Sequence, residues 1–335
     1  MKHPSKNIAS ICLITNVLVS AWLIILIHQK TTLFKTEKNQ IASILNFNDR
    51  LLDVKEAIPF FGDWVWEGKK RKYEEEVELA ERAYAEAKNL ITWLVLLNVC
   101  FFTIVMLIYF KRNRWFALTF GSIGVALVML CAGIVTPMLE MEAYKTDLSI
   151  KLELDSQELL LDIKKSLDKI PFTSAITDDY FPTLSEQLPN EPFIWKKIYP
   201  DKMYFFYENK GIFDVISTLW RTNNIPIAFI VGIFSLLVPI LKIIVSFYLL
   251  YSNKRNLPRI RKTLLYLTKF SMMDVMIVSL FLTYFTFNDL STGVETSSNA
   301  LVGIYLFSAY VILAIIGGYT LERLLDGRWE ASQKE

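Results

Sequence analysis

The 335-residue sequence has few of the residues that build metal or redox sites: three cysteines, two histidines and no Cys-x-x-Cys pair. Cys12, Cys100 and Cys131 each lie inside an apolar run, so we expect neither a disulfide framework nor a zinc site. The sequence also lacks His-Glu-x-x-His, Gly-x-Ser-x-Gly and a phosphate-binding glycine loop with lysine. We therefore expect no enzymatic activity, no metal and no other cofactor.

An excess of charge of one sign is also missing, because 36 basic residues nearly balance 34 acidic residues. A nucleic-acid-binding domain normally carries a strong basic excess, so the composition gives no support for that role. The basic residues gather instead in short connections between apolar runs, which is typical of the cytoplasmic loops of membrane proteins.

Apolar residues are what the sequence has in quantity: 53% of the chain is hydrophobic, and the mean hydropathy is +0.33. Six runs approach or exceed the roughly 18 to 20 apolar residues that cross a bilayer as a helix. We predict a helical polytopic membrane protein with six spans, at residues 8–27, 90–110, 115–135, 225–251, 264–287 and 301–321.

Alternation of six spans places the basic clusters on one side, which predicts that both termini are cytoplasmic. The first run is about as long as a full span and has no clear small-x-small cleavage site. We expect it to be an uncleaved anchor.

The connection between the first two spans is rich in helix-forming residues, and residues 69–110 contain neither glycine nor proline. One helix can therefore run from outside the membrane through the second span. Residues 31–57 are expected to lie antiparallel beside it, which gives a helical arm at about residues 29–89. With its two spans, this arm forms a first region at residues 1–112.

An aromatic cluster lies at the expected tip of the arm, within residues 59–66. Exposed aromatic side chains at this density are typical of docking surfaces, so Phe60, Phe61, Trp64 and Trp66 are candidate partner contacts. The alternative is that the rings pack on one another and close the turn, and the sequence leaves both readings open.

The second region, residues 113–335, carries an extracytoplasmic insert at about residues 138–224. Alternating apolar residues at 148–154 and an aromatic run at 203–207 predict strands, and the spacing at 156–169 predicts a helix between them. We expect a small α+β domain, followed by an amphipathic helix at 211–220 that lies at the membrane interface.

Two charges lie inside predicted spans, Lys242 and Asp274. Counted from the basic connection between those spans, they are roughly 13 and 16 Å deep, so they can form a pair. Ser235 shares a helix face with Lys242, and Ser271 shares one with Asp274.

Other polar groups extend this candidate network. Pro239 has no N–H, which leaves the carbonyl of Ser235 without its usual helical partner. Ser308 is expected at a similar depth on the last span. In one reading the charges form a static pair that fixes helix register; in the other, Asp274 changes protonation as the bundle changes shape.

Five segments resemble the membrane module of the paraquat-inducible protein A family: Thr136-Pro137-Met138, residues 210–216, residues 234–242, residues 270–275 and residues 303–307. The resemblance covers roughly residues 115–322. It implies a four-helix, tetraspan-like module in a bacterial inner membrane. The sequence departs from many family members because it has one module copy and no Cys-x-x-Cys zinc ribbons.

The resemblance also implies a function, which is lipid trafficking with a partner that carries mammalian-cell-entry domains. On this basis we expect a component that handles phospholipid between the membrane and such a partner, with proton coupling through the Lys242/Asp274 network as one mechanism. The alternative is an adaptor or scaffold that assembles or regulates other envelope proteins without moving lipid.

Overall fold

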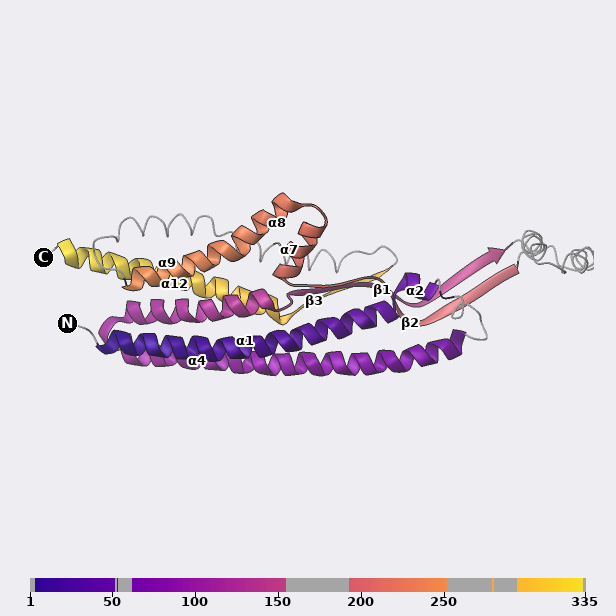
Figure 1. The fold of residues 1–335 in the computed structure, drawn as a ribbon, viewed down its shortest axis with the longest axis horizontal. Helices are drawn as coiled ribbons and strands as arrows, with labels where there is room; N and C mark the ends of the chain where they lie inside the picture. Colours follow the sequence, from indigo (N-terminus) through magenta and orange to yellow (C-terminus); the bar gives the residue numbers. More distant parts are fainter. Residues whose placement is uncertain are drawn as a thin grey trace, which may run out of the picture. The chain divides into compact units, whose positions relative to one another are not determined.

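The computed structural model describes residues 4–51, 53, 62–154, 193–251, 279 and 294–333. Most of these residues are helical (Figure 1). The chain divides into two compact units; the first takes its described residues from 1–44, 70–143 and 206–335, and the second from 45–69 and 144–205. The elements follow in this order: α1 (Pro4–Ile44), α2 (Phe47–Leu51), α4 (Gly62–Val135), β1 (Leu139–Leu154), β2 (Phe193–Lys210), α7 (Ile212–Arg221), α8 (Ile225–Gly232), a π-turn η1 (Ile233–Leu237), α9 (Val238–Tyr251), β3 (Glu295–Ala300) and α12 (Val302–Gln333).

Helices long and apolar enough to cross a membrane account for five of the six predicted spans. The sixth predicted span, residues 264–287, lies outside the described residues apart from Ser279. The five are Ser10–Ile44, Val65–Lys111, Asn113–Val135, Ile225–Tyr251 and Val302–Gly327.

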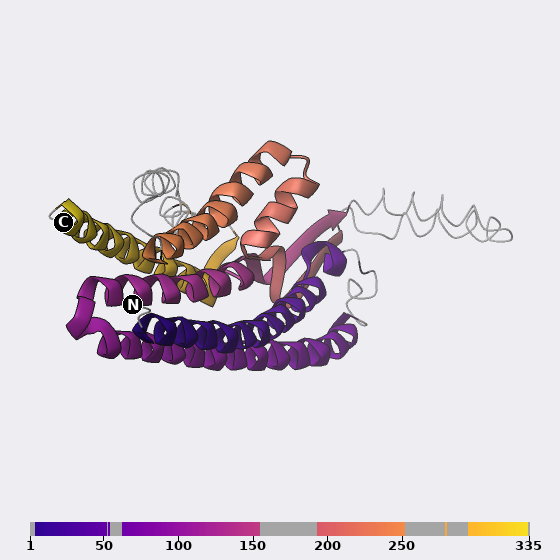
Figure 2. The ribbon, with the colours of Figure 1, turned by 60° about the vertical axis from the view of Figure 1, so that its left-hand side comes forward.

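Helix α4 consists of two helices that meet at Asn113, where the chain reverses direction. The Asn113 backbone is extended, with φ −158° and ψ 93°. Its side-chain oxygen accepts the Phe116 N–H at 3.1 Å, which caps the start of the second half of α4. The two halves pack on each other, since the rings of Phe101 and Phe120 lie 6.4 Å apart, and Figures 1 and 2 show α1 along the first half. The helix predicted from residue 69 to residue 110 is confirmed.

Helix α1 is longer than a span requires. Its 41 residues extend about 60 Å, roughly twice the thickness of a hydrocarbon core. It continues as helix to Ile44, well past the end of the predicted run at residue 27. Lys30 of α1 pairs with Glu86 of α4 at 2.6 Å, and the rings of Phe34 and Tyr84 pack at 4.8 Å. These contacts hold α1 against the first half of α4.

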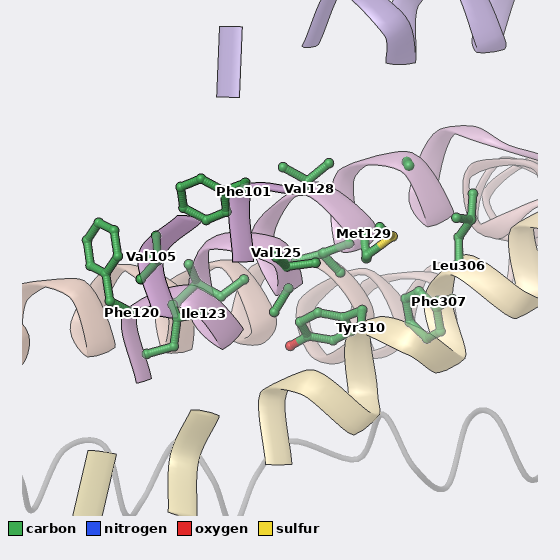
Figure 3. Packing of buried hydrophobic residues seen from close by; sticks show 14 of the residues in the cluster. Phe101, Val105, Phe120, Ile123, Val125, Val128, Met129, Leu306, Phe307 and Tyr310 are labelled. Carbon is green, nitrogen blue, oxygen red and sulfur yellow. The ribbon is translucent and has the colours of Figure 1, made fainter. Parts of the chain in front are cut away.

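The second half of α4 packs closely on α12. A β-carbon on Gly133 would lie 3.0 Å from the backbone nitrogen of Phe307, and one on Gly317 would lie 3.0 Å from the side chain of Ile123. Figure 3 shows Val125 and Met129 of this half of α4 beside Leu306, Phe307 and Tyr310 of α12. Small residues at these positions therefore let two membrane helices approach.

A three-stranded sheet follows α4, with the strand order β2-β1-β3. Strands were predicted at residues 148–154 and 203–207, and the structure extends both. The third strand, β3, was not predicted. Its sequence Glu-Thr-Ser-Ser-Asn-Ala has no apolar alternation, and its pairing with β1 makes it a strand. The helix predicted at 156–169 lies outside the described residues, whereas the amphipathic helix predicted at 211–220 is confirmed as α7.

The second unit is built around one buried arginine. Arg50 of α2 is fully buried, and its guanidinium lies 3.8 Å from the centroid of the Trp66 ring. The same group donates hydrogen bonds to the carbonyl of Pro200 at 3.1 Å and to that of Lys202 at 3.5 Å. Arg50 therefore joins α2, the start of α4 and β2.

Candidate functional site

Segments that are far apart in the sequence meet where α4 ends and α7 and α12 begin. The Met138 N–H donates to the Lys210 carbonyl at 3.0 Å, and the Leu301 N–H donates to the Met138 carbonyl at 2.9 Å. The Gly303 N–H donates to the Pro137 carbonyl at 3.1 Å. We call this set of residues the motif junction: 136–138, 210–211 and 301–303.

Glycine is required at the motif junction because two backbones touch there. A β-carbon on Gly303 would lie 2.5 Å from the Pro137 carbonyl oxygen and 2.8 Å from that of Thr136. A β-carbon on Gly211 would lie 3.1 Å from the Thr136 oxygen. The clash at Gly303 is with backbone, so no side-chain rotation relieves it.

A buried carboxylate lies directly after the motif junction. Glu140 is 4% exposed and accepts hydrogen bonds from the Tyr207 hydroxyl at 2.8 Å and the Asn299 amide at 3.4 Å. The Lys38 ammonium of α1 lies 3.4 Å from the same carboxylate. A buried charge with these partners fixes the three strands and α1 in one arrangement.

A second acidic side chain on the same unit binds α1 as well. Asp214 accepts the Gly211 N–H at 2.8 Å and so caps the start of α7. Its other oxygen lies 2.5 Å from the Lys35 ammonium. Lys35 and Lys38 are one turn apart on α1. Their two ion pairs therefore hold α1 against the residues that flank the motif junction.

The predicted polar network lies partly on described residues. Ser235 is buried within η1, where the Val238 N–H donates to the Ile233 carbonyl, five residues back rather than four. This π-turn immediately precedes Pro239, which is also buried. The helix is therefore locally widened beside Pro239, while the free carbonyl of Ser235 stays a prediction.

Two further members of that network, Lys242 and Ser308, lie on described helices. Lys242 is half-buried on α9, and its carbonyl accepts the Ser246 hydroxyl at 2.7 Å. The Ser308 hydroxyl donates to the Ile304 carbonyl of its own helix at 2.7 Å. Ser271 and Asp274 lie outside the described residues, so the Lys242/Asp274 pair stays a prediction.

The comparison with protein families finds one match, to the family model described as Paraquat-inducible protein A, over residues 202–325. Over these residues the chain is similar to the paraquat-inducible protein A family. No curated protein and no solved structure matches the chain.

The paraquat-inducible protein A match is narrower than the predicted resemblance. It ends at residue 325, close to the predicted 322, but begins at 202 rather than near 115. The second half of α4 and β1 therefore lie outside the matched range. They still hydrogen bond to it, because Pro137 and Met138 contact Gly303, Lys210 and Leu301 in the motif junction.

The aromatic cluster at residues 59–66 lies outside the matched range, and one of its residues, Trp66, is buried. Trp66 is 6% exposed and packs beneath Arg50. Trp66 is therefore not an exposed docking contact in this unit, and its ring packs on Arg50. Phe60 and Phe61 lie outside the described residues, and so does the side chain of Trp64.

An amide network between α1 and the first half of α4 was not predicted. The Asn16 amide donates to the Asn98 oxygen at 3.2 Å, and the Asn98 amide donates to the Leu94 carbonyl at 2.8 Å. Both side chains are buried. The signal was present in the sequence, since each asparagine interrupts an apolar run.

Proposed function

We propose that the protein is a non-enzymatic component of a lipid-trafficking system in a bacterial inner membrane. In this proposal it handles phospholipid between the bilayer and a partner with mammalian-cell-entry domains. The observation that carries the proposal is the family match over residues 202–325. The motif junction supports it, because the family-like segments at 210–211 and 303 both contact residues 136–138 rather than lying scattered over the fold.

The arrangement of the membrane helices supports a multi-pass protein with both termini on one side. Figures 1 and 2 show the N-terminus and the C-terminus at the same end of the first unit as the turn at Asn113. Basic residues lie at that turn and near the C-terminus, among them Lys111, Arg114 and Arg323. By the positive-inside rule this end is cytoplasmic in our proposal.

In this proposal the moving part is the polar network of Ser235, Pro239, Lys242, Ser271, Asp274 and Ser308. A π-turn beside a proline is a weak point in a helix and is often found at functional sites. The half-buried Lys242 lies about one and a half turns beyond the end of η1, so bending there repositions its charge. A change in the protonation of Asp274 then couples to the bend through Lys242.

The experiment is transfer of labelled phospholipid from vesicles that contain the protein to a soluble mammalian-cell-entry-domain protein. We expect Asp274→Asn and Lys242→Ala to reduce the transfer rate at least tenfold, and Lys72→Ala, an exposed site on α4, to leave it unchanged. Normal transfer in both network variants would refute the coupling. No transfer by the unaltered protein, with normal assembly of its partners, would favour the adaptor alternative.

A further inference from the structure

The first unit contains an apolar groove with a volume of about 470 Å³, which lies within the size range of small-molecule sites. Three helical segments line it, and all belong to candidate membrane spans: the first half of α4, the second half of α4, and α12. From the first half of α4 the lining runs from Ile91 to Phe102, a rise of about 16 Å. That length is about half of a hydrocarbon core, which is the depth of one leaflet.

The lining of the groove is suited to an alkyl chain. Val95, Val125, Met129, Leu306 and Leu313 surround it with aliphatic side chains. Figure 3 shows Val125, Met129 and Leu306 of this lining from close by. Such a surface has no charge to bind and no hydrogen bond to offer along most of its length. Its natural occupant in a bilayer is therefore hydrocarbon.

The groove opens sideways to the surroundings of the helices. Val99 is 57% exposed and Tyr305 is 61% exposed, although both line the groove. In a bilayer, these two side chains face lipid. An acyl chain can thus enter laterally, without crossing the packed interface at Gly133 and Phe307.

Polar and charged groups lie at the end of the groove farther from Asn113. Residues Tyr84, Lys88, Ile91 and Val95 are spaced by three or four residues and share one face of α4. The exposed Lys88 ammonium lies 5.6 Å from the centroid of the Tyr84 ring. A lysine and tyrosines at this depth match the headgroup region of a bilayer.

We propose that the groove binds one acyl chain of a membrane phospholipid, with the phosphate of that lipid beside Lys88. The inference rests on the proposed function for the role of the lipid as cargo. It goes further by assigning a site on the first half of α4, which lies outside the family match. The helices that precede the matched range then supply one wall of a lipid site.

The test is the phospholipid that remains on the purified full-length chain. The protein is reconstituted into phosphatidylglycerol nanodiscs and transferred to detergent, and the retained lipid is counted by mass spectrometry. We expect about one phospholipid per chain. Ala309→Phe fills the groove and should abolish retention, whereas Ile312→Phe, at an exposed position outside the lining, should not.

The headgroup position is tested in the same assay with two lysines of α4. Lys88→Ala should lower the affinity for phosphatidylglycerol about fivefold, as expected for one basic residue near an anionic headgroup, and Lys88→Arg should restore it. Lys72→Ala, an exposed lysine farther along α4, is the control. Equal affinity in all four proteins, or retention of free fatty acid in place of phospholipid, would overturn the assignment.

A photo-crosslinking residue locates the lipid even if Ala309→Phe fails to fold. Benzoylphenylalanine replaces Phe102, which lines the groove, or Phe110, which is 52% exposed on the same helix and lies outside it. After the detergent wash, labelled phosphatidylglycerol should crosslink at position 102 and not at position 110. Equal labelling at both positions, or none at 102, would refute the site.

These measurements test the groove independently of the proposed function, because lipid retention by the purified chain needs no partner protein. Lipid retained in the groove, without transfer to a mammalian-cell-entry-domain protein, would refute the proposed function and leave the site assigned. Transfer without retention or crosslinking at position 102 would refute the groove and leave the proposed function standing.

Discussion

Gly303→Ala should destabilise the protein at the motif junction. The added β-carbon would lie 2.5 Å from the Pro137 carbonyl oxygen, and it must move to at least about 3.0 Å, a shift of about 0.5 Å. That oxygen cannot rotate away without loss, since it accepts the Gly303 N–H. The backbone of α12 or of the α4–β1 connection must therefore move.

The magnitude follows from two terms. Overpacking at a rigid site costs about 1 to 3 kcal/mol. Weakening the hydrogen bond between Gly303 and Pro137 adds about 1 kcal/mol. We expect a loss of about 2 to 4 kcal/mol in the free energy of unfolding. At roughly 2 °C per kcal/mol for a large chain, the melting temperature should fall by about 4 to 8 °C.

The assay is thermal unfolding in a mild detergent, with a matched glycine on the same helix as the control. A β-carbon on Gly318 would have nothing within 4 Å, so Gly318→Ala should stabilise α12 by up to about 1 kcal/mol. The two variants should therefore shift the melting temperature in opposite directions. Equal shifts, or a Gly303→Ala protein as stable as the unaltered one, would refute the close backbone contact.

Three further changes test other parts of the structure. Arg50→Met removes the cation that stacks on Trp66 and leaves backbone carbonyls without its hydrogen bonds; it should cost about 2 to 4 kcal/mol, seen as faster proteolysis of the second unit. Asn98→Leu deprives Asn16 of its partner within the membrane and should lower stability by about 1 kcal/mol in detergent melts, whereas no change would make the amide network dispensable. Glu140→Ala should cost about 2 kcal/mol and Glu140→Gln less, because the amide oxygen still accepts a hydrogen bond; equal losses would show that charge alone matters there.

The helices could be predicted from the sequence because their signals are local. The absence of glycine and proline from residue 69 to residue 110 predicts an unbroken helix, and the structure has one.

Features set by tertiary contacts could not be predicted in this way. The polar strand β3 forms because β1 provides a neighbouring edge, which no local pattern encodes. Trp66 belongs to a segment whose composition is typical of an exposed aromatic tip, but Arg50, 16 positions earlier in the chain, covers its ring. Glu140 and Lys38 pair across about 100 residues, and neither position stands out in the sequence.

The central claim is that phospholipid passes through the helical module rather than only surrounding it. The most direct measurement is photo-crosslinking in living cells with labelled phospholipid, with the probe at the buried Ser235 or Val238 and, as controls, at the exposed Leu237 or Ile244. We expect labelling at the buried positions that decreases in Asp274→Asn, while labelling at the exposed positions is unchanged. Labelling confined to Leu237 and Ile244 would contradict it and would leave the protein as an adaptor that does not carry lipid.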